Sequence, residues 1–279
     1  MIDTLYVNGC SWTVGNELEQ DPTFLEMLAE HSLHLFNPDD PLDSNLVNDN
    51  GEIVSTLFEL FNDYVWAGKL KKLLNIPNLI NDSIGGASNA RILRTTIDFL
   101  LQLPKDKRSS TLVVIGWTVT ERDEIFLKNN WHRFNLTQKF SNILDRTIIS
   151  DEEFIKKVDK FQEDYVANIY EDISGIQKYF QGVYLLSNLL ENLGICYYFF
   201  SALPQWWTAG ELQVSCNVEE RFPIQAEWYE SHSNIHAMRD NMFVFVRDHQ
   251  FLLGKYGHPL LEGHTAWATH LLPFIKKIL

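Results

Sequence analysis

The chain has 279 residues, of which 45% are hydrophobic and 22% charged, so it can bury a sizeable core and is not an intrinsically disordered polypeptide. Its formal net charge of −14 argues against a sequence-independent nucleic-acid binder, which needs clustered Lys and Arg to neutralise phosphates. No apolar run approaches the roughly 18 to 20 residues of a membrane span, so we expect no such span.

The N-terminus and the cysteines predict the compartment. The first residues carry neither the basic nor the apolar segment of a secretory signal. Cys10, Cys196 and Cys216 are odd in number and follow no pairing pattern, which indicates a reducing compartment without a disulfide framework. We therefore expect a cytoplasmic protein. The sequence contains no motif that requires a cofactor and does not indicate an oligomeric state.

Short apolar or β-branched runs, each ending in Gly or a polar residue, predict the strands of an α/β domain. Residues 111–115 are apolar enough for the central strand of a parallel sheet. The other expected strands are 4–7, 79–80, 194–200 and 242–246. A short helix followed by a loop is expected within 16–50, and longer helices at 53–74 and 262–278.

Residues 123–192 carry no strand signal and have apolar side chains at helical spacing over most of their length. This stretch is longer than the crossover of about a dozen residues that joins parallel strands. We interpret the chain as one domain, residues 1–279, with a helical insertion at 123–192 that serves as a lid or an oligomer contact. The stretch 205–240 is expected to be loop-rich and to wall a pocket with Trp206, Trp207, Phe222, Trp228 and Tyr229.

Three of the expected strands end in a polar motif. The first runs into Asn8-Gly9-Cys10-Ser11, in which glycine permits a sharp turn that presents Ser11 above the strand end. The second runs into a Gly85-Gly86 turn whose backbone N–H groups suit an oxyanion or phosphate. The third ends in Gly116-Trp117-Thr118.

Each of these motifs also has a purely structural interpretation. Ser11 can cap the following helix, as Ser88 or Asn89 can cap the helix after the Gly-Gly turn. Arg122, which follows the third motif, sits between two acidic residues and suits a surface ion pair.

A histidine stands late in the chain, in Gly257-His258-Pro259. The residue before a proline is biased towards an extended conformation, so His258 can project from a loop. A free imidazole near a serine is the minimum for an activated nucleophile. The structural alternative is an ordinary surface histidine.

The order of these four motifs resembles the SGNH hydrolase superfamily of GDSL-like esterases and lipases, particularly its phage-encoded members. The resemblance implies a flavodoxin-like three-layer α/β/α fold with a mostly parallel sheet of about five strands. It also implies that Ser11 is the nucleophile and His258 the base, and that the N–H groups of Ser11 and Gly86 hold the oxyanion. The substrate would be a small carboxylic ester, with an O-acetylated glycan one candidate.

Three positions depart from the family pattern. Cys10 replaces the Asp of the first motif, and Thr118 replaces an Asn that completes the oxyanion hole. Lys255 occupies the position of the triad Asp, three residues before the histidine, where a cation cannot orient the imidazole. A Ser-His dyad, or a triad completed by Asp248, would restore the mechanism, with Arg122 and Asn89 as further auxiliary residues.

Two other functions remain open. One is a binding module for glycan or a protein partner, in which the fold persists without the missing Asp and Asn. The other is a metal site at His232 and His236, whose i, i+4 spacing suits a metal if the segment is helical, with Glu230 close by. The absence of an evident third ligand argues against the metal site. Cys10 as nucleophile would require its side chain to point the other way along the turn.

Overall fold

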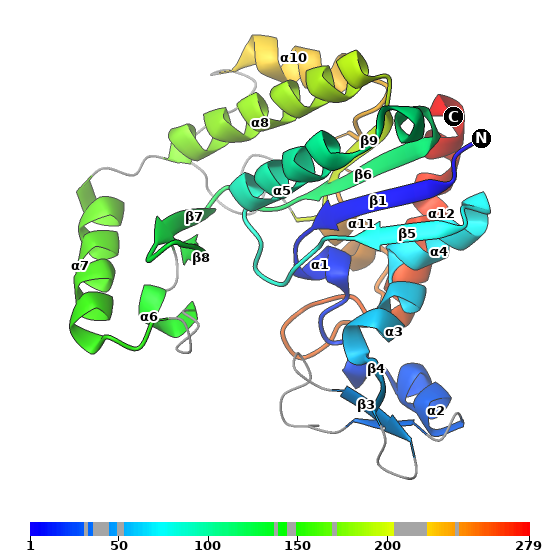
Figure 1. The fold of residues 1–279 in the computed structure, drawn as a ribbon, viewed down its shortest axis with the longest axis horizontal. Coiled ribbons are helices and arrows are strands. Elements are labelled where there is room, and N and C mark those ends of the chain that lie inside the picture. The colour runs from blue at the N-terminus through cyan, green and yellow to red at the C-terminus, as the bar shows by residue number, and fades with distance from the viewer. Residues whose placement is uncertain are drawn as a thin grey trace.

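The computed structural model describes residues 1–30, 33–35, 45–48, 53–136, 139–143, 149–168, 172–203, 222–237 and 240–279. A four-stranded parallel sheet, in the order β5-β1-β6-β9, lies at the centre of this part of the chain (Figure 1). Its strands are β1 (Thr4–Gly9), β5 (Asn78–Asn81), β6 (Thr111–Trp117) and β9 (Cys196–Ser201). Because β1 lies between β5 and β6, the chain reverses direction across the sheet between β1 and β6. In open α/β sheets, ligands bind at the carboxyl ends of the strands at this point.

Helices cover both faces of the sheet, so its central strands are buried on both sides (Figure 1). One layer contains α5 (Asn89–Gln102) and α8 (Asp172–Leu193), and the other contains α4 (Trp66–Leu74) and α12 (Leu261–Ile278). The expected α/β/α architecture with a parallel sheet is therefore confirmed. The core is continuous through the sheet and both layers.

The expected strand at 242–246 is wrong, because these residues form the helix α11 (Met242–Asp248). The side chain of Asn241 caps the helix by accepting a hydrogen bond from the Val244 N–H at 3.0 Å. Met242 and Val246, four residues apart, place one helical face in the core. The β-branched, aromatic composition that suggested a strand is overridden by this capping and packing. The described sheet accordingly has four strands and not five.

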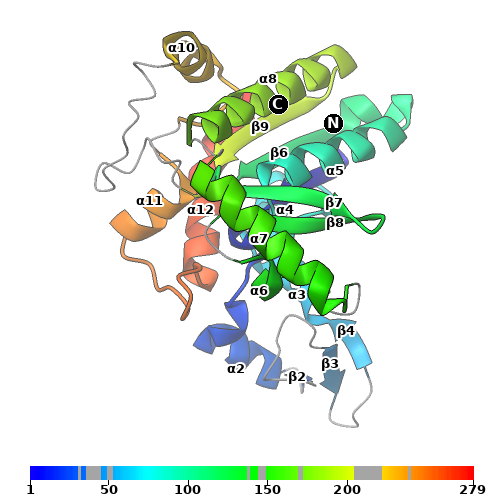
Figure 2. The same cartoon turned by 90° about the vertical axis from the view of Figure 1, so that its left-hand side faces the viewer.

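The stretch 123–192 is not helical throughout. It contains a β-hairpin of β7 (Arg122–Leu127) and β8 (Asn130–Asn135), joined by Lys128 and Asn129, which both have left-handed backbone angles. Two such residues form the turn whose twist matches a hairpin. Figure 2 shows the hairpin with α7 (Glu152–Asn168), which packs with α6 (Phe140–Ile143) on a small apolar cluster of its own. By contrast, α8 packs on the main sheet as the crossover into β9. The lid or oligomer role of this stretch stays a prediction.

The region expected to hold one helix from 53 begins with a strand. An antiparallel sheet is formed by β2 (Leu33–Leu35), β3 (Asn45–Asn48) and β4 (Ile53–Thr56). The helical part then divides into α3 (Leu57–Tyr64) and α4, because Val65 adopts an extended conformation between them. The remaining elements are α1 (Ser11–Val14), η1 (Leu18–Gln20), α2 (Pro22–Glu30), η3 (Lys105–Ser110) and α10 (Pro223–Ser231).

No helix in the described ranges has the length and apolar composition needed to cross a membrane. Trp206 and Trp207, two of the expected pocket aromatics, lie outside the described residues. Tyr229 is buried and belongs to the core, whereas Phe222 and Trp228 line a cavity of about 310 Å³ beside α8, as expected. The last helix, α12, contains Pro273 in its interior.

Candidate active site at the carboxyl ends of the central strands

Ser11 is the first residue of α1 and follows β1 after one residue, Cys10. It thus lies at the point where the order of strands along the sheet reverses. Its residue exposure is 4%, and the preceding Cys10 is wholly buried in the core. The position before α1 carries no side-chain cap. The hydroxyl is therefore held at the end of a central strand without a capping role, whereas the Cys10 thiol points away from solvent.

Two glycines of the sequence motifs make room for a neighbouring side chain. Gly9 and Gly116 are paired across β1 and β6. A Cβ atom on Gly9 would lie 2.2 Å from the Thr13 hydroxyl oxygen, and one on Gly116 would lie 2.8 Å from the same atom. Both glycines are thus required for α1 to pack on the strand ends. This packing fixes the position of Ser11.

The Gly85-Gly86 turn presents backbone N–H groups beside the same strand ends. Gly86 has a φ of +72°, which favours glycine, and a Cβ there would lie 2.8 Å from Nη1 of Arg133. The same Nη1 atom donates a hydrogen bond to the Gly85 carbonyl at 3.0 Å. Neither the Ser11 N–H nor the Gly86 N–H donates a hydrogen bond to any residue that the structure describes. Both donors are available to an anion.

Thr118 is tied to α5 by its backbone. The Asn89 side chain accepts a hydrogen bond from the Thr118 N–H and donates one to the Thr118 carbonyl, each at 2.9 Å. The Thr118 hydroxyl accepts a hydrogen bond from Nη1 of Arg122 at 3.1 Å. Asn89 therefore positions the end of β6, and Arg122 does not form the ion pair with its sequence neighbours that the sequence suggested.

The imidazole of His258 contacts a carboxylate that the sequence analysis did not name. Oε2 of Glu17 lies 2.8 Å from Nδ1 of His258, and the side chain of Glu17 is 4% exposed. The same Oε2 accepts the His258 N–H, and Oε1 accepts the Tyr256 N–H. Glu17 has a φ of 73°, a conformation that is costly for a residue other than glycine and that clusters at functional sites.

The histidine loop is held along its length by the segment that follows Ser11. Besides the contacts of Glu17, Oε1 of Gln20 accepts the Lys255 N–H, and Oδ2 of Asp21 accepts the Leu261 N–H, both at 2.9 Å. Asp21 also caps α2 through its other oxygen. Gly254 packs so closely that a Cβ there would lie 2.7 Å from Glu17. The position of His258 is therefore coupled to the chain directly after Ser11.

Asp248 does not take the expected place of the third triad member. Its carboxylate accepts a hydrogen bond from Nε of Arg247 at 2.9 Å, and its side chain is more than half exposed at the end of α11. Lys255, at the family's Asp position, contacts the Glu17 segment through its backbone N–H. The carboxylate that contacts His258 comes from the other end of the sequence, so spacing from the histidine cannot reveal it.

The electrostatic surroundings keep the imidazole neutral. Burial lowers the pKa of His258, and the positive charge of Arg122 lowers it further, while the hydrogen bond and charge of Glu17 raise it; the net direction is downward from 6.5. Burial raises the pKa of Glu17, but hydrogen bonds from His258 and Tyr256 outweigh it, so its net pKa is lowered. At neutral pH the pair is thus a carboxylate and a neutral imidazole.

The hydrogen bonds of His258 run to Glu17, and none joins it to Ser11 among the described residues. The ring of Trp12, the residue after Ser11, lies 6.4 Å from the His258 ring between centroids. Catalytic hydrogen bonds are often long before substrate binds, so this geometry is compatible with a nucleophile and base.

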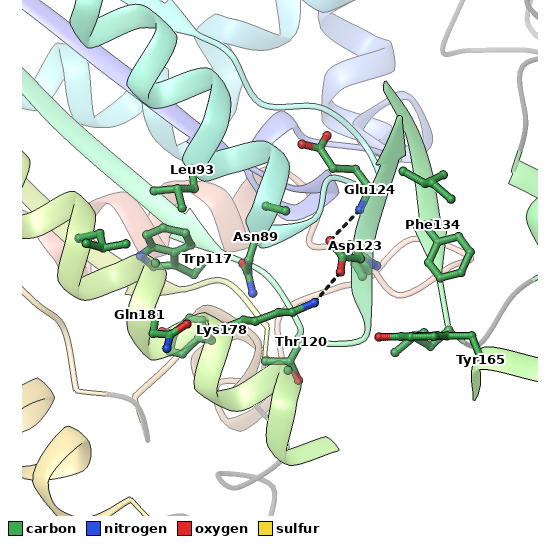
Figure 3. Close-up of a pocket in the computed structure, with 18 of the residues that line it drawn as sticks. Asn89, Leu93, Trp117, Thr120, Asp123, Glu124, Phe134, Tyr165, Lys178 and Gln181 are labelled. Atoms are coloured by element: carbon green, nitrogen blue, oxygen red, sulfur yellow. Dashed lines mark hydrogen bonds and ion pairs between the residues drawn. The ribbon is translucent and has the colours of Figure 1, made fainter. Parts of the chain in front are cut away.

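A mainly apolar cavity of about 470 Å³ is lined by Asn89, Trp117 and Thr120, among other residues (Figure 3). Asn89 and Arg122, which both contact Thr118, line it, whereas Ser11 and His258 do not. Nζ of Lys178 on α8 donates a hydrogen bond to Oδ2 of Asp123 on β7 at 3.2 Å, and both residues line the cavity. Its apolar walls are Leu93, Trp117, Phe134, Leu136, Phe161, Tyr165 and Leu185.

His232 and His236 do not form the metal-binding pair that their sequence spacing suggested. The α10 helix ends at Ser231, so the two histidines do not share a helical face. Nδ1 of His232 hydrogen-bonds to the Trp228 carbonyl. His236 instead contacts Asp240 and Tyr198.

Comparisons with known proteins give a family and a distant similarity of fold. A model for a family of unknown function, DUF6071, matches residues 44–279, a range that includes His258 but not Ser11 or Glu17. A comparison with curated proteins gives no match.

Two solved structures resemble the chain over nearly its full length. One is a protein assigned to the lipolytic G-D-S-L family from Desulfitobacterium hafniense, with 12% identity, a TM-score of 0.43, and coverage of 99% of both chains. The other is a member of that family from Veillonella parvula, with 11% identity, a TM-score of 0.43, and coverage of 97% of this chain and 96% of that one.

Proposed function

The chain belongs to the DUF6071 family, and we propose that it is a serine hydrolase that cleaves a carboxylic ester with a Ser11–His258–Glu17 triad. The observation that carries this proposal is the contact of a buried carboxylate with Nδ1 of His258. In a neutral imidazole, a proton on Nδ1 leaves Nε2 as an acceptor. The lone pair that accepts the serine proton is then on Nε2, the ring nitrogen that is not hydrogen-bonded to Glu17.

The chemistry of the triad is acyl transfer. His258 takes the Ser11 proton as Oγ attacks the ester carbonyl, and Glu17 stabilises the resulting imidazolium. His258 then returns the proton to the leaving alcohol. Water, deprotonated by the same imidazole, attacks the acyl-enzyme and releases the acid and Ser11.

The oxyanion would be held by the N–H groups of Ser11 and Gly86, which are both free of hydrogen bonds to described residues. Thr118 supplies the third donor through its hydroxyl in this proposal. Loss of one such donor typically costs about 10²- to 10³-fold in rate. Thr118→Ala should therefore lower kcat by about that factor without removing activity.

In this proposal, part of the substrate occupies the cavity lined by Asn89 and Arg122. Its apolar walls suit an acyl or aromatic group, because burying such a group there removes apolar surface from water. An O-acetylated glycan remains one candidate, with its acetyl group at Ser11. An ester of a longer acyl chain would make more use of the cavity.

The test is hydrolysis of p-nitrophenyl acetate at about pH 8 by the wild type and by the Ser11→Ala, His258→Ala and Glu17→Gln variants at equal concentration. We expect turnover that Ser11→Ala and His258→Ala reduce to near background and that Glu17→Gln lowers by about 10⁴-fold to a measurable residual rate. Labelling of the wild type, but not Ser11→Ala, by a fluorophosphonate provides a second readout. If the wild type neither turns over the ester nor reacts with the probe, the proposal fails and the binding-module alternative takes precedence.

A further inference from the structure

A second cluster of functional side chains lies apart from the triad, between the segment after α10 and the helix α12. Oδ2 of Asp240 hydrogen-bonds to Nε2 of both His236 and His270, each at 2.9 Å. The three atoms lie within 4.8 Å of one another. Two imidazole nitrogens and one carboxylate oxygen therefore converge on one small volume.

We propose that His236, Asp240 and His270 bind a divalent cation of the zinc class. Two histidines with a carboxylate form a common ligand set of zinc enzymes, with bonds of about 2.0 to 2.2 Å. Tetrahedral bonds of that length place ligand atoms about 3.3 to 3.5 Å apart. The two 2.9 Å contacts thus need to widen by about 0.5 Å, and the two histidine nitrogens, which lie within 4.8 Å of each other, need to approach to about 3.4 Å; rotations of the Asp240 and His270 side chains, both partly exposed, can supply these shifts.

A hydrogen bond to Nδ1 orients the His236 ring, as is usual for metal-bound histidines. The Tyr198 hydroxyl lies 2.7 Å from Nδ1 of His236, the nitrogen not directed at Asp240. With a metal on Nε2, the Nδ1–H would donate to the Tyr198 oxygen, as the second ring nitrogen of metal-bound histidines usually does.

Aromatic rings hold both imidazoles in place. The His236 ring is met edge-on by Trp267 and Phe274, with interplanar angles of 89° and 85°. His270 stacks on Trp267, with centroids 5.1 Å apart and an angle of 24°. Ligand directions set in this way reduce the entropy lost when an ion binds.

The cluster is open to solvent on one side. A cavity of about 310 Å³, lined by His236, Asp240 and Tyr198, adjoins it and leaves room for water as a further ligand. Glu230 and Lys277 also line this cavity, with opposite charges. An ion can enter here because the side chains of Asp240 and His270 are 42% and 25% exposed.

The experiment is titration of metal-stripped, full-length protein with ZnCl₂ by isothermal calorimetry, and with CoCl₂ by visible absorption. We expect one equivalent to bind to the wild type. His270→Ala and Asp240→Asn should each abolish that equivalent, and Tyr198→Phe should weaken it by about 10- to 100-fold. His232→Ala is the matched control, because His232 lines the same cavity but is bonded to Trp228, and it should bind zinc as the wild type does.

A structural role alone predicts a different result. If Asp240 only bridges the two histidines, the substitutions lower the Tm, and added zinc raises the Tm of neither the wild type nor the variants. The proposal is overturned if the wild type takes up no equivalent of zinc, or if the bound equivalent persists in both His270→Ala and Asp240→Asn. Circular dichroism of the metal-free variants checks folding, and the partly exposed His270 provides the decisive variant if Asp240→Asn does not fold.

Discussion

Oε2 of Glu17 lies 2.8 Å from Nδ1 of His258, although the two residues are 241 positions apart in the sequence. Glu17 follows Ser11 by six residues, and it contacts the histidine loop through three hydrogen bonds. One short segment thus supplies both the candidate nucleophile and the carboxylate that orients its base. Movement of either group relative to the other is restricted by this arrangement.

Glu17→Gln should lower kcat by about 10⁴-fold, the loss seen when the carboxylate of a serine triad becomes an amide and the imidazole is held in the wrong tautomer. Asp248→Asn should leave kcat unchanged, because Asp248 bonds to Arg247 and is exposed. Steady-state ester hydrolysis by the two variants, with circular dichroism as a folding check, compares the two carboxylates directly. Loss of activity in Asp248→Asn with retention in Glu17→Gln would refute the assignment.

The pH dependence of kcat/KM should report the charge around His258. The base must be neutral and its pKa lies below 6.5, so activity should fall only as the pH drops below that value. Arg122 lowers this pKa, so Arg122→Gln should move the acidic limb to higher pH. Glu17 raises it, so the residual activity of Glu17→Gln should have its acidic limb at lower pH. Shifts in the same direction for both variants would contradict this electrostatic description.

Three strands of the sheet, β1, β6 and β9, were predictable from the sequence because they are buried on both faces. A strand such as β6, wholly buried, requires a continuous apolar run, and that run is visible without knowledge of its partners. The ends of β1 and β6 and the loop of His258 were also predictable, because a glycine or a proline marks each of them in the sequence. These signals are local.

The features that were missed depend on contacts between distant residues. Nothing near Glu17 in the sequence distinguishes it from Glu19, and only the packing of the 254–261 loop selects it. The hairpin of β7 and β8 has mostly partly exposed side chains and a Lys128-Asn129 turn, so no apolar run or Asn-Gly pair marks it. Asp240 and His270, 30 positions apart, meet only because the segment after α10 returns to α12.

Two arginines beside the candidate oxyanion site should favour an anionic substrate. Arg91, Arg94 and Arg247 each pair with a carboxylate, whereas Arg122 and Arg133 pair with none among the described residues. Partial desolvation and the charge of Arg122 together lower the pKa of Arg133. Arg133 contacts the Gly85 carbonyl and Arg122 contacts the Thr118 hydroxyl, so both lie beside candidate oxyanion residues. In a protein of net charge −14, such a pair is a local positive site.

We expect a higher kcat/KM for a p-nitrophenyl ester that carries a carboxylate than for an uncharged ester of equal length. Arg133→Ala should reduce this preference by about 10- to 100-fold, the value of a hydrogen bond to a charged group. Arg247→Ala, a paired and exposed arginine on α11, is the matched control. An undiminished preference in Arg122→Ala/Arg133→Ala would exclude these residues as its source.

His264 should make the protein sensitive to acid. This histidine is wholly buried in α12, and Nδ1 accepts a hydrogen bond from the Trp66 N–H at 3.3 Å. Burial lowers its pKa to about 3, and the charges of His258 and Lys69 contribute in the same direction. Because the folded pKa lies below the ordinary value of 6.5, the unfolded chain binds more protons between these values.

The free energy of unfolding should therefore fall with decreasing pH below 6.5, by up to about 1.4 kcal/mol per pH unit from His264 alone. His264→Asn removes the titrating group, while its amide oxygen can still accept the Trp66 N–H. Urea unfolding of both proteins at several pH values between 6.5 and 5.5 gives the two slopes. This window lies about one unit or more above the ordinary Glu pKa of 4.5, so the lowered pKa of Glu17 contributes little there. We expect a flatter slope for His264→Asn, even if its stability at pH 7.5 is lower because a smaller side chain leaves a cavity. Equal slopes would show that acid sensitivity in this window arises elsewhere.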